Sequence, residues 1–131
     1  MLEIIARVAS REPEVLTTYL FGSRSRGTGR SDSDVDVAVL LDPEVPDRRA
    51  WELRLDLGAR LAEALGREVD LFVMGEADLD LTFRILREGR RVFERNRDQG
   101  RYLEARLASL YYDYQPFLDA YLRGTARHYG G

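Results

Sequence analysis

The alternation of hydrophobic and polar residues along the first part of the chain predicts one helix followed by two strands. Apolar residues recur at helical spacing over residues 2–8, and Pro13 marks the end of that helix. The β-branched and aromatic run 15–21 predicts a strand that ends at Gly22. After a polar loop, residues 34–41 first alternate between polar and apolar and then become wholly apolar. This pattern predicts a second strand with one partly polar face.

The middle of the chain continues the alternation of helices and strands. Leucine recurs every fourth residue within 49–65, and Gly66 follows, which predicts a helix with a glycine C-cap. Residues 69–74 predict a third strand, and residues 79–87 predict a further helix. A short strand is expected at residues 92–93.

The last part of the chain has a single long helical pattern over residues 101–122, with a kink predicted at Pro116. We therefore expect residues 1–97 to form a minimal α/β domain and residues 98–131 to form a C-terminal helical extension. The predicted fold class is α/β, with a small mixed β-sheet flanked by helices. Whether the C-terminal helix belongs to the core or forms a partner interface stays open at this stage.

Composition narrows the chemistry that this domain can perform. The 131 residues include no cysteine and a single histidine. They also include no lysine, because all 20 residues of the Lys and Arg type are arginine. These counts exclude disulfides, thiol nucleophiles, a Schiff-base lysine and multi-histidine metal sites. The formal net charge of −3 argues against direct nucleic-acid binding. No apolar run approaches the ~20 residues of a membrane span, and we expect a cytoplasmic protein.

Two aspartates at the start of the second predicted strand indicate a cation site. Asp34 and Asp36 are two positions apart, so their carboxylates lie on one face of the strand. Two such carboxylates repel each other unless a positive charge lies between them. Carboxylate oxygens are the ligands that Mg²⁺ prefers, so the pair predicts a magnesium site.

The loop before these aspartates carries groups that bind anions. Gly22 and Gly27 allow backbone N–H groups to approach an anion, and the hydroxyl of Ser23 is a further donor. Arginines add cationic donors at three positions, namely Arg24, Arg26 and Arg30. Of these we expect Arg26 to bind phosphate. An anion-binding loop followed by a cation site is the layout expected for a metal-bound nucleoside triphosphate.

A third carboxylate lies in the next predicted strand. Asp70 stands between Val69 and Leu71, and a carboxylate in an apolar strand is costly unless it has a partner. If this strand lies beside the strand of Asp34 and Asp36, the three acids converge. Three carboxylates can hold two Mg²⁺ ions, one near the attacking oxygen and one on the triphosphate.

The pattern of Gly22-Ser23, ten further residues and Asp34-x-Asp36 resembles the signature of the DNA polymerase β-type nucleotidyltransferase superfamily. The short chain and the third acid, Asp70, resemble its minimal nucleotidyltransferases. The resemblance covers about residues 15 to 95. It is specific, because it involves residue types, their spacing and the flanking strands together.

This resemblance implies roles for individual residues. Gly22 and Ser23 would bind the β- and γ-phosphates of ATP, the expected substrate. Asp34 and Asp36 would bind both Mg²⁺ ions. Asp70 would complete the metal site and act as the general base or assist it.

The C-terminal helix resembles that of one branch of these proteins, the antitoxins of HEPN/MNT toxin–antitoxin pairs. Those antitoxins commonly end in a Tyr-x-Asp…Pro-Phe…Tyr run, which matches residues 111–121 here. Some members of that branch transfer AMP to a tyrosine of the toxin. The implied function is therefore transfer of AMP from ATP to a tyrosine hydroxyl of a HEPN-type toxin partner.

Two alternatives stay open beside this interpretation. The chain could be an antibiotic-type nucleotidyltransferase with a small-molecule acceptor, although no second domain is present to form an acceptor pocket. It could also be a non-catalytic antitoxin that neutralises its partner by binding. Incubating the partner with this protein, ATP and Mg²⁺ and then measuring the mass of the partner would distinguish an enzyme from an antitoxin that only binds. The nucleobase, the number of transfers and a homo-oligomeric state are not predicted by the sequence.

Overall fold

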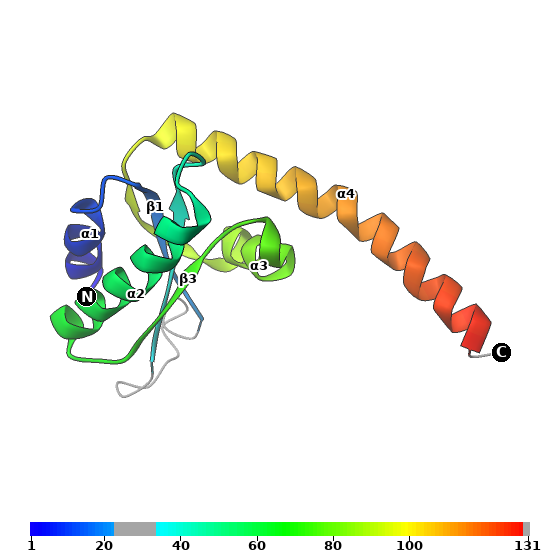
Figure 1. Ribbon diagram of the computed structural model, residues 1–131, viewed down its shortest axis with the longest axis horizontal. Coiled ribbons are helices and arrows are strands. Elements are labelled where there is room, and N and C mark those ends of the chain that lie inside the picture. The colour runs from blue at the N-terminus through cyan, green and yellow to red at the C-terminus, as the bar shows by residue number, and fades with distance from the viewer. Residues whose placement is uncertain (23–33, 130–131) are drawn as a thin grey trace.

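The computed structural model describes residues 1–22 and 34–129, and for most residues beyond Asp113 it describes the backbone alone. Its helices and strands follow the order that the hydrophobic pattern predicts (Figure 1). In chain order they are α1 (Leu2–Ser10), β1 (Val15–Phe21), β2 (Val35–Leu41), α2 (Asp47–Leu65), β3 (Val69–Val73), the 3-10 turn η2 (Glu76–Asp78), α3 (Leu79–Glu88), β4 (Arg90–Glu94) and α4 (Arg97–Tyr129). Within the described residues, no helix is both long enough and apolar enough to cross a membrane.

The four strands form one mixed sheet in the order β3-β2-β1-β4. Strand β2 runs parallel to β3, and β1 is antiparallel to both β2 and β4. The parallel pair is joined by α2, as a crossover between parallel strands requires. The prediction of a small mixed sheet flanked by helices is confirmed.

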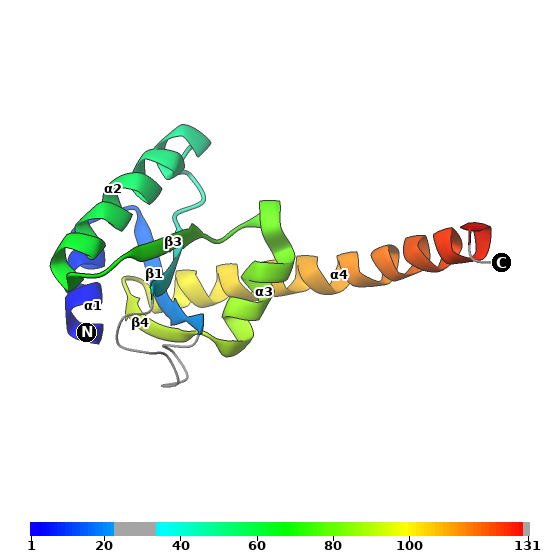
Figure 2. The same ribbon diagram turned by 90° about the horizontal axis from the view of Figure 1, so that it is seen from below.

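Helices cover both faces of the sheet (Figure 2). Helices α1 and α2 lie on one face, where Ile5, Leu57 and Leu61 are fully buried against the strands. Helix α3 and the first turns of α4 lie on the other face, over a cluster that includes Tyr19 and Ile85. The sheet is therefore the middle layer of three, and its ends are the places where polar groups can remain accessible.

Helix α4 has two parts with different surroundings. Leu103 and Leu107 pack against the cluster around Tyr19. Further along, Figure 1 shows the helix leaving the body of the protein. Pro116 lies inside α4, and the helix continues through it to Tyr129. The division of the chain into domains at residues 97 and 98 stays a prediction.

Candidate active site

The three aspartates singled out from the sequence come together at one end of the sheet. Asp34 directly precedes β2, Asp36 is the second residue of β2, and Asp70 is the second residue of β3. Because β2 and β3 are parallel neighbours, Asp36 and Asp70 are direct register partners. Ala38, two residues after Asp36, belongs to the cluster beneath α3 and α4. Both carboxylates therefore belong to the sheet face that α3 covers.

The electrostatics of Asp36 reflect this arrangement. Partial burial raises the pKa of its carboxyl group, and the negative charges of Asp70 and then Asp34 raise the pKa further. Asp36 is half-buried, whereas Asp34 and Asp70 are exposed. The three groups are thus close enough for their charges to interact, and a cation between them would relieve the repulsion.

The donor set fits a hard divalent cation by its chemistry, since it consists of carboxylate oxygens. Among residues 1–22 and 34–129, however, no three acidic, histidine or cysteine side chains already stand in a geometry that holds a metal ion. Binding a cation at Asp34, Asp36 and Asp70 would therefore need side-chain rotation. Their roles as metal ligands stay a prediction.

Gly22 connects the phosphate-binding prediction to the aspartates. It directly follows Phe21, and Phe21 is the register partner of Asp36 across β1 and β2. Its φ of +76° lies in the left-handed region, and a Cβ at this position would collide with Oδ2 of Asp36. The turn therefore favours glycine at this position, and a side chain here would force the Asp36 carboxylate to shift. Ser23 and Arg26, the other predicted nucleotide ligands, lie outside the described residues.

A cavity of about 820 Å³ extends around the edge strand β3, between α2 and α3. Asp36 and Asp70 line it together with two arginines that the sequence analysis did not select, Arg54 of α2 and Arg84 of α3. In the sequence both are polar positions of amphipathic helices. Only the packing of the two helices against the sheet brings them to the aspartates.

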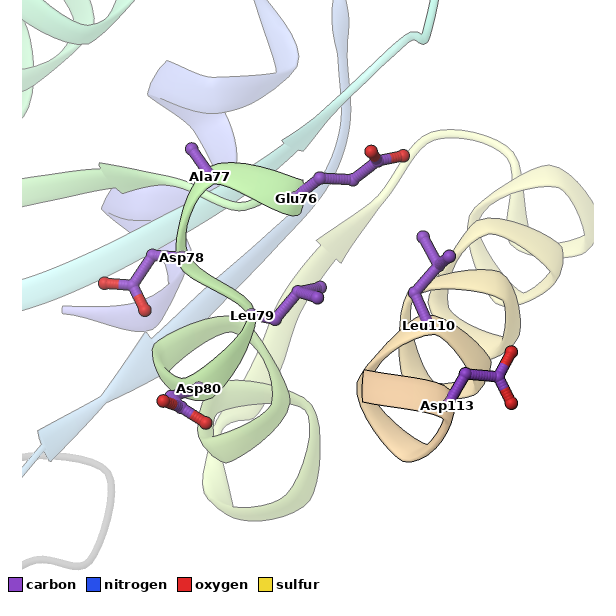
Figure 3. A pocket seen from close by; sticks show the side chains of 7 residues that line it. All are labelled: Glu76, Ala77, Asp78, Leu79, Asp80, Leu110 and Asp113. Atoms are coloured by element: carbon purple, nitrogen blue, oxygen red, sulfur yellow. The ribbon is translucent and has the colours of Figure 1, made fainter. Parts of the chain in front are cut away.

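A second cavity, of about 640 Å³, lies between α3 and α4 (Figure 3), and neither Asp36 nor Asp70 lines it. Leu79 and Leu110 line it, and so do four acidic side chains, Glu76, Asp78, Asp80 and Asp113. None of the predicted site residues contributes to its lining. The candidate chemistry therefore belongs to the cavity around β3.

Comparisons with known proteins identify relatives of this chain. The protein adenylyltransferase MntA of Shewanella oneidensis is 32% identical over 96 residues, which are 73% of this chain and 66% of MntA. The chain thus spans slightly less than two thirds of that relative.

Solved structures share the fold over nearly the whole chain. A chain in a crystal structure of the toxin–antitoxin with AMP-PNP has a TM-score of 0.76 and 26% identity, over 95% of this chain and 97% of that one. A chain in the structure of tri-AMPylated Shewanella oneidensis HEPN toxin in complex with MNT antitoxin has a TM-score of 0.69 at 22% identity. This second match covers 95% of this chain and 98% of that one, and it shows likeness of fold alone. Residues 3–98, which contain all three aspartates and Gly22, match the family described as Polymerase beta, Nucleotidyltransferase, and the chain belongs to this family.

Proposed function

We propose that this protein transfers AMP from ATP to a tyrosine hydroxyl of a HEPN-type toxin and thereby acts as its antitoxin. The observation that carries the proposal is the pairing of Asp36 with Asp70 across β2 and β3, with Gly22 against Asp36. Similarity to two known proteins supports AMP as the transferred group and a protein as the acceptor. One relative is named a protein adenylyltransferase, and a toxin–antitoxin structure with AMP-PNP has the same fold. We place the reaction in the cytoplasm, where ATP is available.

In this proposal each residue of the site has a separate role in the transfer of AMP. The acceptor oxygen forms a bond to the α-phosphorus of ATP, the bond from that phosphorus to the β-phosphate oxygen breaks, and pyrophosphate leaves. Asp70 receives the proton of the acceptor hydroxyl or orients the group that does. The backbone at Gly22 approaches the β- and γ-phosphates.

Asp34, Asp36 and Asp70 would together hold Mg²⁺, and we expect two ions. Bound Mg²⁺ would offset the three negative charges and stabilise the charge on the phosphates. Burial and the charges of Asp70 and Asp34 raise the pKa of Asp36, and a bound cation would offset these charges and favour the ionised carboxyl group.

The test is to incubate the protein with its toxin partner, ATP and Mg²⁺ and to measure the mass of the toxin. We expect a mass increase corresponding to AMP on a tyrosine. Asp36→Asn should slow the transfer on the order of a thousandfold or more, because it removes a ligand from the metal site. Asp56→Asn, which changes an exposed carboxylate on α2, is the matched control and should leave the rate unchanged.

Three results would contradict the proposal. Transfer by Asp36→Asn at the rate of the unmodified protein would show that the aspartates are not catalytic. A toxin that is neutralised without any gain in mass would favour an antitoxin that acts by binding alone. AMP transfer to a small-molecule antibiotic, with none to the toxin, would favour the antibiotic-type alternative.

A further inference from the structure

Helix α3 forms one wall of the cavity that contains the paired aspartates. Its Arg84 lines this cavity of about 820 Å³ together with Asp36 and Asp70. Helix α3 also covers the sheet face to which both aspartates belong, since its Ile85 packs in the same cluster as Ala38. Arg84 therefore faces the candidate active site from an element that the nucleotidyltransferase signature in the sequence does not include.

The backbone that carries Arg84 is well anchored. Ile85 is 1% exposed, and Leu81 packs against the cluster that Ile85 belongs to. At the start of the helix, the hydroxyl of Thr82 donates to the carbonyl of Gly75 and accepts from its N–H, both at 3.1 Å. The helix therefore holds the backbone of Arg84 in a defined place on the wall of the cavity that Asp36 and Asp70 also line.

The two arginines that line the cavity differ in the number of contacts that their guanidinium groups make. The Nε of Arg54 donates to the carbonyl of Leu71 at 3.2 Å, and its guanidinium lies 5.5 Å from the centre of the Trp51 ring. Arg84 is exposed and, within the described part of the chain, makes no hydrogen bond or ion pair. Its five N–H donors remain available for a ligand.

We propose that Arg84 binds the phosphate chain of the nucleotide, as a cationic contact from α3 in addition to the backbone contact at Gly22. The guanidinium group matches phosphate oxygens in a forked geometry. The aspartates that line the same cavity repel an anion, and a free arginine beside them offsets part of that repulsion. This inference rests on the proposed function, because it assumes that a nucleotide enters this cavity.

The test compares Arg84→Ala with the unmodified protein in the binding of AMP-PNP in the presence of Mg²⁺, measured by calorimetry. We expect Arg84→Ala to weaken binding about tenfold or more, since a charge-assisted hydrogen bond to phosphate is lost. Arg84→Lys keeps the charge without the fork and should recover part of the affinity. Both variants should keep the melting temperature, because the side chain is exposed.

Arg87→Ala is the matched control. Arg87 is also an exposed arginine of α3, but its guanidinium lies 5.8 Å from the Phe83 ring centre and pairs with Glu88. It does not line the cavity of Asp36 and Asp70. We expect this variant to bind AMP-PNP within about twofold of the unmodified protein.

The inference is overturned if Arg84→Ala binds AMP-PNP as tightly as the unmodified protein. The proposed function would still hold in that case if the unmodified protein transfers AMP to the toxin. The inference is also overturned if the variant loses adenosine binding in the same proportion, because adenosine has no phosphate. A rise in KM for the toxin with unchanged AMP-PNP affinity would assign Arg84 to the acceptor instead. If the unmodified protein binds no AMP-PNP and transfers no AMP, the proposed function itself fails, and this inference fails with it.

Discussion

At the scale of single residues, the contact between Gly22 and Asp36 joins the predicted phosphate-binding turn to the candidate metal site. Two requirements coincide at Gly22, namely a positive φ and the absence of a Cβ beside Oδ2 of Asp36. Gly66 shares only the first, because its φ is +66° and a Cβ there would meet no atom within 4 Å. Comparing substitutions at the two glycines therefore distinguishes the effect of backbone strain from the effect of crowding at the Asp36 carboxylate.

We expect Gly22→Ala to abolish AMP transfer and to lower stability more than Gly66→Ala. Both changes place an alanine in the left-handed region, at a cost of roughly 1–2 kcal/mol. Only Gly22→Ala also displaces the Asp36 carboxylate. Melting temperature and the rate of transfer, measured for both variants, test this expectation. Equal effects of the two changes on activity would show that the contact of Gly22 with Asp36 is not needed for transfer.

At the scale of elements, a buried carboxylate attaches α4 to the sheet. Glu104 of α4 is 7% exposed and accepts a hydrogen bond from the hydroxyl of Tyr19 on β1. Arg91 of β4 donates to both carboxylate oxygens of Glu104, at 2.9 and 2.7 Å. Burial of Tyr19, followed by its hydrogen bond to Glu104 and the charge of Glu104, raises the pKa of the tyrosine above its ordinary value. This group of three residues joins two strands to the start of α4.

The raised pKa of Tyr19 predicts a loss of stability at alkaline pH. The unfolded chain releases the tyrosine proton near pH 10, whereas the folded protein retains it to a higher pH, so ionisation favours unfolding. The contribution of Tyr19 is fully present below about pH 10 and decreases as the pH rises further. We therefore expect the melting temperature to fall less steeply between about pH 9 and 11 in Tyr19→Phe than in the unmodified protein. Parallel curves for the two proteins would argue against a raised pKa of Tyr19 in the folded protein.

At the scale of the whole molecule, α4 extends beyond the body that its first turns help to build. Its core contacts include Leu103, Leu107 and the carboxylate of Glu104, all in the first half of the helix. Figure 1 shows the second half pointing away from the sheet and the other helices. This arrangement supports a partner-docking role for the second half, in agreement with the antitoxin proposal.

The combined change Tyr114→Ala and Tyr121→Ala tests this role of the helix. The two positions are seven residues apart, about two helical turns, and so share one face of α4. We expect the double variant to bind AMP-PNP normally and to lose about 2 kcal/mol or more of binding energy for the toxin. Tyr102→Ala is the control, since Tyr102 is 66% exposed on the first half of α4. A double variant that binds the toxin normally but melts several degrees lower would show that these tyrosines serve stability instead.

Much of this protein is determined by its sequence alone, because the signals are local. The kind and order of the helices and strands follow from hydrophobic periodicity, whereas some boundaries differ: the last helix spans Arg97–Tyr129 and not 101–122, and the last strand spans Arg90–Glu94 and not 92–93. The Asp34-x-Asp36 spacing predicts two carboxylates close together at the start of β2 for the same reason, and Asp34 directly precedes that strand. The family, too, was predicted correctly from Gly22, Ser23 and this pair, since the motif combines residue types with a defined spacing. Ser23 itself lies outside the described residues, so its role remains a prediction.

The tertiary structure decided what depends on contacts between distant parts of the chain. Asp70 meets Asp36 only because β3 pairs with β2 in one particular parallel register, and a shift by one residue would turn its side chain to the other face. Arg84 reaches the same cavity because α3 packs across that face of the sheet. The burial of Glu104 beside Tyr19 likewise depends on how α4 meets β1. Periodicity tells which side of an element is apolar, but the partner that covers this side is determined by packing in three dimensions.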